Sequence, residues 1–342
     1  MAIIGRNSEI GELDQVLNSG SAEFAVVYGR RRVGKTFLVN EYFKKKSHIY
    51  LYASGVKDGD KKQQLSNFTQ ALLEAFSLDI SLDDFSFSSW EKAFRQLTDL
   101  IAKQAKNKKI IVFLDELPWL VTPRSRLMQT LDYYWNRHWS HNNNIKLIVC
   151  GSAATWMLSH LINEEGGLYN RVSRVIKLEP FDLRITRVYL KSLGLNYNYE
   201  QVLEIYMAFG GIPHYLNFLK KGLSATQNIN ETCFTAGHKL RDEFPRLFRS
   251  LFENHEACEE IVRVIAQHKY GITRSALLKK LKRSEDGGRL TARLRELEAS
   301  GFIKCFISES REKGQYYKVL DEYSLFYLTW IEKTKRGRLA KN

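Results

Sequence analysis

Three runs of apolar residues in the first half of the chain predict buried strands. They cover residues 22–28, 110–114 and 145–150. Each run is nearly continuous rather than alternating, which is typical of parallel strands that are covered on both faces. A helix over residues 36–46 is expected after the first run, because Phe37, Leu38 and Tyr42 are spaced for one buried face. This order predicts an α/β domain with a parallel sheet flanked by helices.

From about residue 183 the strand pattern stops and helical periodicity takes over. Helices are expected over residues 199–209 and 215–221, as parts of a helical lid. The sequence then predicts three further helices, the first over residues 257–267 and the second capped by Thr273. The third helix carries Leu290, Leu294 and Leu297 on one face, and Gly301 ends it.

Two short strands follow, over residues 302–307 and 315–320, around a charged turn. Three helices and a hairpin are the order of a winged helix. We therefore divide the chain into a P-loop domain, a helical lid, a winged-helix domain and a basic tail or the start of a further domain. The boundaries are residues 1–182, 183–250, 251–320 and 321–342.

The first strand leads into a phosphate-binding motif. Its residues are Gly29, Arg30, Arg31, Arg32, Val33, Gly34, Lys35 and Thr36, and they match the P-loop pattern at every fixed position. The two glycines let the backbone wrap around phosphate, and the helix N-terminus favours the anion. Lys35 is expected to reach the β- and γ-phosphates, and the Thr36 hydroxyl to ligate Mg²⁺. The arginines occupy variable positions, as phosphate ligands or as solvated loop charges.

The second and third apolar runs end in polar side chains that complete this site. Asp115 and Glu116 follow the second strand, where parallel sheets place their ligands. We expect Asp115 to hold Mg²⁺ through a water molecule, and Glu116 to act as the general base toward the attacking water. The third strand is expected between the other two. Ser152, at its end, is predicted to sense the γ-phosphate or, alternatively, to cap a helix.

The composition of the chain indicates which classes of partner it can bind. The chain of 342 residues has a net charge of +14, which attracts polyanions such as ATP, ADP and nucleic acid. It has no apolar run long enough to span a bilayer and no signal-peptide pattern, so no membrane partner is expected. The four cysteines are far apart in the sequence and are expected to be reduced, mostly buried thiols. A cytoplasmic location follows from these features.

In this order, these motifs resemble those of the prokaryotic "archaeal ATPase" family of AAA+/STAND-like P-loop proteins. The resemblance rests on five segments and covers nearly the whole chain. They are residues 4–10, 29–36, 114–120, 148–152 and 210–216. It implies ATP and Mg²⁺ as cofactors and a fold of P-loop domain, lid and winged helix. Longer relatives often continue into a nuclease-like domain. The acidic residues that such a nuclease needs are not supplied by this sequence.

Two further site assignments come from that resemblance. Arg171 occupies the place of the family's arginine finger, although Asn170 stands where many relatives have glycine. Arg174 is the competing choice, and a surface ion pair is the alternative for Arg171. Gly211 and Pro213 match the lid turn that lies against the nucleotide base in the family. From the residues alone, they predict a helix-breaking turn.

The winged-helix region carries a positive net charge. Residues 261–318 hold 14 Lys and Arg against 6 Asp and Glu. This supports contact with double-stranded DNA, and the alternative is a winged helix that contacts protein. Candidate DNA contacts are Arg289 and Arg293 on the third helix, and Arg311 and Lys313 at the hairpin tip.

Three hypotheses follow from the sequence. The first is an ATP-driven switch that couples nucleotide state to DNA or a partner through the winged helix. The second is a winged-helix DNA-binding regulator that binds nucleotide with negligible turnover. The third is an assembly ATPase, acting as a homo-oligomer, whose winged helix binds protein only.

Overall fold

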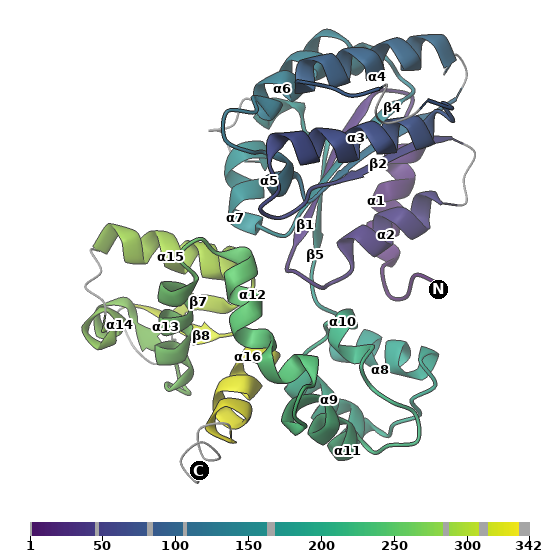
Figure 1. The fold of residues 1–342 in the computed structure, drawn as a ribbon. Coiled ribbons are helices and arrows are strands. Elements are labelled where there is room, and N and C mark those ends of the chain that lie inside the picture. The colour runs from purple at the N-terminus through teal and green to yellow at the C-terminus, as the bar shows by residue number, and fades with distance from the viewer. Residues whose placement is uncertain are drawn as a thin grey trace. The chain divides into compact units, whose positions relative to one another are not determined.

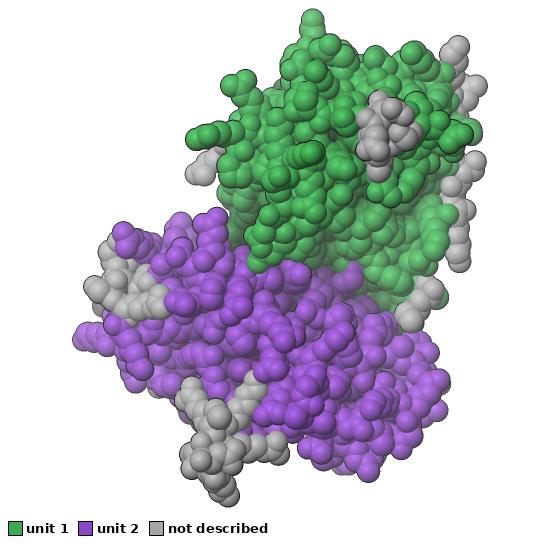
Figure 2. Space-filling model, viewed as in Figure 1, with its two compact units in different colours: residues 1–29, 35–178 green, residues 30–34, 179–342 purple. Residues whose placement is uncertain are grey.

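The computed structural model describes residues 2–44, 48–80, 85–104, 108–162, 168–282, 287–307 and 314–334. It divides into two compact units (Figure 1). The first comprises residues 1–29 and 35–178, and the second comprises residues 30–34 and 179–342 (Figure 2). Most of the P-loop's variable segment therefore clusters with the second unit.

A five-stranded parallel sheet forms the centre of the first unit, in the order β2-β3-β4-β1-β5. The strands are β1 (Glu23–Gly29), β2 (Ile49–Ser54), β3 (Ile110–Asp115), β4 (Ile145–Gly151) and β5 (Arg174–Leu178). The three predicted strands are present, and β4 lies between β1 and β3 as expected. The edge strands β2 and β5 were not predicted. β5 is interrupted by the charged residues Arg174 and Lys177, and β2, although apolar from Ile49 to Ala53, is only partly buried.

Helices of the first unit surround this sheet (Figure 1). They are α1 (Asn7–Asn18), α2 (Lys35–Phe43), α3 (Lys61–Ala75), α4 (Trp90–Gln104), α5 (Leu117–Leu120), α6 (Leu127–Arg137) and α7 (Ala154–Met157). The main core packs α3, α4 and α6 against the sheet, with Phe68, Phe94 and Trp135 among its members. Helix α2 ends at Phe43, earlier than the sequence pattern suggested.

The lid elements begin the second unit. They are α8 (Leu183–Ser192), α9 (Tyr199–Phe209), α10 (Pro213–Leu216), α11 (Ala225–Ile229) and α12 (Glu243–Leu251). Helix α9 has the predicted bounds, but the predicted helix over residues 215–221 is wrong, because α10 ends at Leu216. The buried amide of Asn228 explains this end. It accepts from the Lys220 N–H at 2.8 Å and donates to the Lys220 carbonyl at 2.9 Å, which holds the chain in a turn.

The winged helix follows in the predicted order. Its elements are α13 (His255–Ala266), β6 (Ile272–Thr273), α14 (Arg274–Lys280), α15 (Gly287–Ala299), β7 (Ile303–Ile307) and β8 (Gln315–Val319). Thr273 caps α14 through the Ala276 N–H, as expected. The strands form an antiparallel sheet in the order β6-β8-β7, in which β6 was not predicted.

The chain continues into α16 (Glu322–Phe326), which packs within the second unit. Tyr323 is fully buried there, with its ring centroid 4.9 Å from that of Tyr215. Shorter turns of helix complete the two units. They are Trp139–His141, Leu158–Ile162, Tyr169–Arg171, Asn230–Phe234, Lys239–Asp242 and Tyr327–Ile331. Among the described residues, no helix is long and apolar enough to cross a membrane.

Candidate nucleotide site

The P-loop begins where β1 meets its neighbour β5. Gly29 has a φ of 145°, and a Cβ atom there would lie 2.1 Å from the carbonyl oxygen of Leu178. Only glycine fits this approach. Helix α2 begins at Lys35, whose Nζ donates to the Gly29 carbonyl at 2.9 Å. An ammonium has three N–H donors, so the same lysine can also bond to a phosphate oxygen.

Four predicted residues meet at the carboxyl ends of β3 and β4. The Thr36 hydroxyl donates to Asp115 Oδ2 at 2.7 Å. Glu116 Oε2 accepts from both the N–H and the hydroxyl of Ser152, at 3.1 and 2.9 Å. Ser152 does not cap a helix, because α7 begins after Ala153. The structure thus pairs the predicted magnesium residues with each other, and the predicted base with the predicted sensor.

The Glu116 backbone is held in an uncommon conformation. Its φ of 47° lies in the left-handed region, which a residue with a side chain adopts only at a free-energy cost. Its carbonyl accepts from the Trp119 N–H at 2.8 Å, and its own N–H donates to Asp115 Oδ1 at 3.0 Å. This turn directs the carboxylate toward Ser152.

The oxygen atoms at this place fit Mg²⁺. The ion prefers hydroxyl, carboxylate and phosphate oxygens, and Thr36 and Asp115 supply the first two from atoms that already lie in contact. Asp115 is 3% exposed, and the adjacent thiol of Cys150 is fully buried. Burial raises the pKa of that thiol, and the Asp115 carboxylate raises it further. We infer that Cys150 is packing rather than a ligand.

Sequence reasoning missed Tyr52 on the edge strand β2. Its hydroxyl lies 3.4 Å from Asp115 Oδ2, the same oxygen that accepts from Thr36. Ser54, two residues further along β2, is the register partner of Asp115. The aliphatic and aromatic run of residues 49–53 could have indicated this strand.

Two of the P-loop arginines bond to carboxylates within the second unit. Arg30 is 5% exposed and pairs with the buried Asp321, so a solvated loop charge is a wrong interpretation for this residue. Its guanidinium carbon also lies 5.1 Å from the ring centroid of Phe302. Arg32 binds both oxygens of Glu243, with Nε 2.7 Å from Oε1 and Nη2 3.0 Å from Oε2. Burial raises the pKa of Glu243, and Arg32 opposes this shift.

In the lid, the glycine-proline turn is fixed by backbone contact. The Phe181 N–H donates to the Gly211 carbonyl at 2.8 Å, and a Cβ on Gly211 would lie 1.8 Å from the Phe181 oxygen. Pro213 is the first residue of α10, where its missing N–H is tolerated. Both residues therefore form the turn that the sequence predicted.

The two candidate arginine fingers differ in their surroundings. Arg171 is exposed, and its side chain has no hydrogen bond or ion pair with another described residue. Arg174 lies on β5, where Nη1 is 3.2 Å from Glu12 Oε2. The ion pair with Glu12 gives Arg174 a structural role and leaves Arg171 as the better candidate.

The candidate DNA contacts are only partly described. Arg289 is exposed on α15, whereas Arg293 is less exposed and lies near Glu296. Burial raises the pKa of Glu296, and the charge of Arg293 opposes that rise. Arg311 and Lys313 lie outside the described residues. The leucines at positions 290, 294 and 297 are buried, as the helix pattern predicted.

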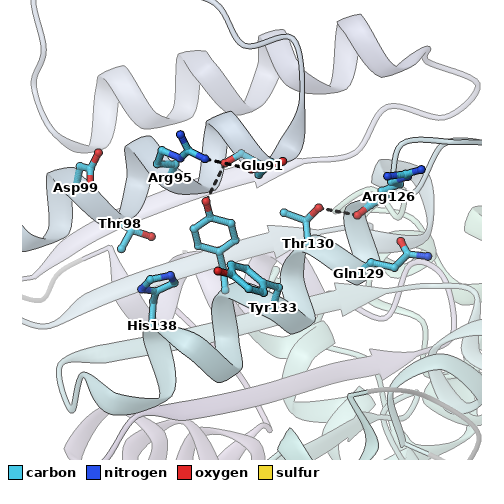
Figure 3. Close-up of a pocket in the computed structure, with 10 residues that line it drawn as sticks. Glu91, Arg95, Thr98, Asp99, Arg126, Gln129, Thr130, Tyr133 and His138 are labelled. Carbon is cyan, nitrogen blue, oxygen red and sulfur yellow. Dashed lines mark hydrogen bonds and ion pairs between the residues drawn. The ribbon is translucent and has the colours of Figure 1, made fainter.

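Two hollows of the first unit differ in their relation to the site. One, of about 730 Å³, is lined by Thr36, Asn40, Tyr50 and Tyr52 among others and borders the magnesium residues. The other, of about 490 Å³, lies on α4 and α6 and includes no predicted site residue (Figure 3). Tyr133, which is 57% exposed, lines the second hollow.

Tyr133 belongs to an aromatic cluster on α6 and the turn that follows it. The other three members are buried, and they are Tyr134, Trp135 and Trp139. These three side chains serve in core packing, and Tyr133 is the exception.

Comparisons with known proteins agree with this geometry. Residues 3–219 match the family described as "ATPase domain predominantly from Archaea". The chain is 28% identical over 334 residues to an uncharacterised protein of Methanocaldococcus jannaschii, covering 96% of this chain and 68% of that protein.

Two solved structures share the fold. The Walker-type ATPase of Pyrococcus abyssi superposes with a TM-score of 0.65 at 21% identity, over 96% of each chain. The ORC2 protein of Aeropyrum pernix, solved as ADPNP–ADP complexes, superposes with a TM-score of 0.59 at 14% identity. That match covers 98% of this chain and 96% of the other.

Proposed function

Because this chain belongs to the family of ATPase domains found predominantly in Archaea, we propose that it binds and hydrolyses ATP with Mg²⁺ and couples nucleotide state to its winged helix. The observation that carries the hydrolytic part is the pairing at the strand ends. Thr36 and Asp115 share a 2.7 Å hydrogen bond, and Ser152 holds Glu116 through two donors.

Each residue has a distinct task in this proposal. Gly29, Gly34 and the N-terminus of α2 cradle the phosphates, while Lys35 neutralises charge on the β- and γ-phosphates. Thr36 and Asp115 hold Mg²⁺, which supplies electrostatic stabilisation to the transferring phosphoryl group when it is bound. Glu116 accepts the proton of the attacking water, and Ser152 fixes the direction of that carboxylate and senses the γ-phosphate.

Assignments that rest on family resemblance complete the proposal. Arg171 is the proposed arginine finger, contributed by a second copy of the chain. Gly211 and Pro213 are the proposed contact with the base. Mixing Arg171→Ala protein with Lys35→Ala protein tests the finger, because each variant retains what the other lacks. Recovery of hydrolysis in the mixture is expected, and a mixture as inactive as its components would contradict a role between copies.

The coupling part rests on the P-loop arginines. Arg30 and Arg32 belong to the loop that surrounds phosphate, yet they bond to Asp321 and Glu243. Phe302, which packs on Arg30, is followed directly by strand β7 of the winged helix. A shift of this loop on nucleotide binding would therefore act on the second unit through charged hydrogen bonds. We propose double-stranded DNA as the partner that the winged helix reads.

DNA binding measured in defined nucleotide states tests the coupling. Fluorescence anisotropy of a labelled duplex is recorded with ADP and with ATP, using Glu116→Gln protein to keep ATP intact. We expect the DNA affinity to differ between the two nucleotides, and the difference to shrink when Glu243→Gln is added. Equal affinity in both states would contradict the coupling, even if hydrolysis were measured.

A matched pair of variants tests the DNA surface itself. Arg289→Glu should weaken binding and lower the salt dependence, because each lost phosphate contact removes about 0.9 from the slope. Arg295→Glu is the control, since Arg295 is exposed about 120° further around the same helix and its replacement changes the charge equally. Equal curves for the two variants would favour a winged helix that binds protein, a possibility that the proximity of Arg293 to Glu296 also favours.

A further inference from the structure

The hydroxyl of Tyr52 lies beside the carboxylate that we assign to Mg²⁺. Thr36 Oγ1 at 2.7 Å and Tyr52 Oη at 3.4 Å both approach Asp115 Oδ2. A hydroxyl that binds Mg²⁺ through its oxygen keeps its proton, so Thr36 can still donate to Asp115 when the metal is bound. Tyr52 is a second neutral donor to the same carboxylate oxygen.

The ring of Tyr52 is held in place by its neighbours on the sheet. Its centroid lies 5.3 Å from that of Phe113, its register partner on β3, with an interplanar angle of 27°. The ring of Tyr50, two residues earlier on β2, is nearly parallel, with centroids 6.5 Å apart and an angle of 5°. These ring contacts restrict the rotamer of the Tyr52 side chain, so its hydroxyl is positioned without further ordering cost.

Two matched rows of side chains run between α2 and β2. In the first row, Thr36 meets Asp115 and Tyr52. In the second, one helical turn and two strand residues away, Asn40 accepts from the Tyr50 hydroxyl. Both tyrosines line the same hollow of about 730 Å³ that reaches Thr36. The rows differ in one respect, because only Tyr52 contacts the magnesium carboxylate.

We propose that Tyr52 is a positioning residue for the metal, which orients Asp115 by donating a hydrogen bond to the oxygen that turns toward Mg²⁺. Partners of this kind commonly tune metal affinity, because they fix the direction of the ligand. The inference rests on the proposed magnesium role of Asp115. It concerns affinity for the metal rather than the chemical step.

Nucleotide binding without turnover tests this role. Binding of a fluorescent ADP analogue to the full chain is followed while Mg²⁺ is varied, and again in EDTA. Tyr52→Phe is expected to raise, by about 3- to 10-fold, the Mg²⁺ concentration at which the metal enhances analogue binding half-maximally. This is the effect expected when one hydrogen bond to a metal-binding carboxylate is lost. Binding in EDTA should not change. Tyr50→Phe, which loses the bond to Asn40 instead, should match the wild type.

The variants Tyr52→Phe and Asp115→Ala separate the possible failures. If Asp115→Ala abolishes the Mg²⁺ dependence and Tyr52→Phe behaves as Tyr50→Phe does, the inference about Tyr52 is overturned while the proposed site stands. If Asp115→Ala leaves the Mg²⁺ dependence intact, the magnesium assignment itself is wrong, and the role of Tyr52 is overturned with it. Equal melting temperatures of the two tyrosine variants establish that any difference between them does not arise from misfolding.

Discussion

Asp115 and Asp321 are both buried carboxylates that bond to a residue of the P-loop, and they differ in what surrounds them. Asp115 is 3% exposed and accepts from the Thr36 hydroxyl within the first unit. Asp321 is 1% exposed and pairs with the Arg30 guanidinium within the second. The first meets a neutral donor and can take a cation, whereas the second already has one. The same residue type thus forms a permanent ion pair in one unit and, in our proposal, a metal ligand in the other.

The largest effect is expected where the permanent pair is broken. Asp321→Ala leaves the buried charge of Arg30 without its partner and removes the cap on the Ser324 N–H at 2.9 Å. Loss of one partner of a buried pair costs about 3–5 kcal/mol of unfolding free energy. Chemical denaturation measures this loss.

Asp321→Asn separates the two contributions, because it keeps an oxygen for the cap and removes the charge. Asp115→Ala provides the comparison in the other unit and should destabilise the chain much less, since its partner Thr36 is neutral. Similar losses for the two alanine variants would contradict the distinction between a ligand carboxylate and a paired one.

Removal of the phosphate-binding cation is expected to have the next largest effect. Lys35→Ala should lower kcat/KM for ATP by about 10²–10³-fold, the usual effect of losing one preorganised charge at a reacting group. Lys44→Ala is the control, because Lys44 lies just past the end of the same helix with a 73% exposed side chain. A steady-state phosphate-release assay measures both. Near-normal turnover in Lys35→Ala protein would refute the phosphate site.

The contrast between the two carboxylates also decides what the sequence can predict. Asp115 directly follows an apolar strand and comes after a P-loop, so local pattern and chain order identify it. Asp321 precedes a short helix, and its neighbourhood indicates only an N-cap. Its partner is 291 residues away, and no local pattern encodes such a pairing.

The same reasoning explains the other hits and misses. Strands buried on both faces were predicted from their apolar runs, while the edge strand that carries Tyr52, which is only partly buried, was missed. The winged helix was predicted because its helix face, cap and hairpin are local features. The early end of α10 was missed because a distant buried amide, Asn228, determines it.

Glu116→Gln isolates the chemical step within the first unit. The amide keeps the shape of the side chain but cannot accept the proton of water. We expect hydrolysis at saturating ATP to fall at least about 10²-fold with ATP affinity nearly unchanged. Equilibrium binding and single-turnover hydrolysis measure the two quantities separately. Weaker ATP binding with an unchanged rate would assign Glu116 to binding instead.

The smallest effect concerns the residue that holds this carboxylate. Ser152→Ala removes the 2.9 Å hydroxyl contact to Glu116 Oε2 and keeps the 3.1 Å contact from the backbone N–H. Because one of two donors remains, we expect only about a 3- to 10-fold lower kcat, which corresponds to the net free-energy contribution of one hydrogen bond. Combination with Glu116→Gln decides whether Ser152 acts through Glu116. If it does, the double variant should hydrolyse ATP as fast as Glu116→Gln alone. A further drop in the double variant would mean that Ser152 acts on the phosphate independently of the base.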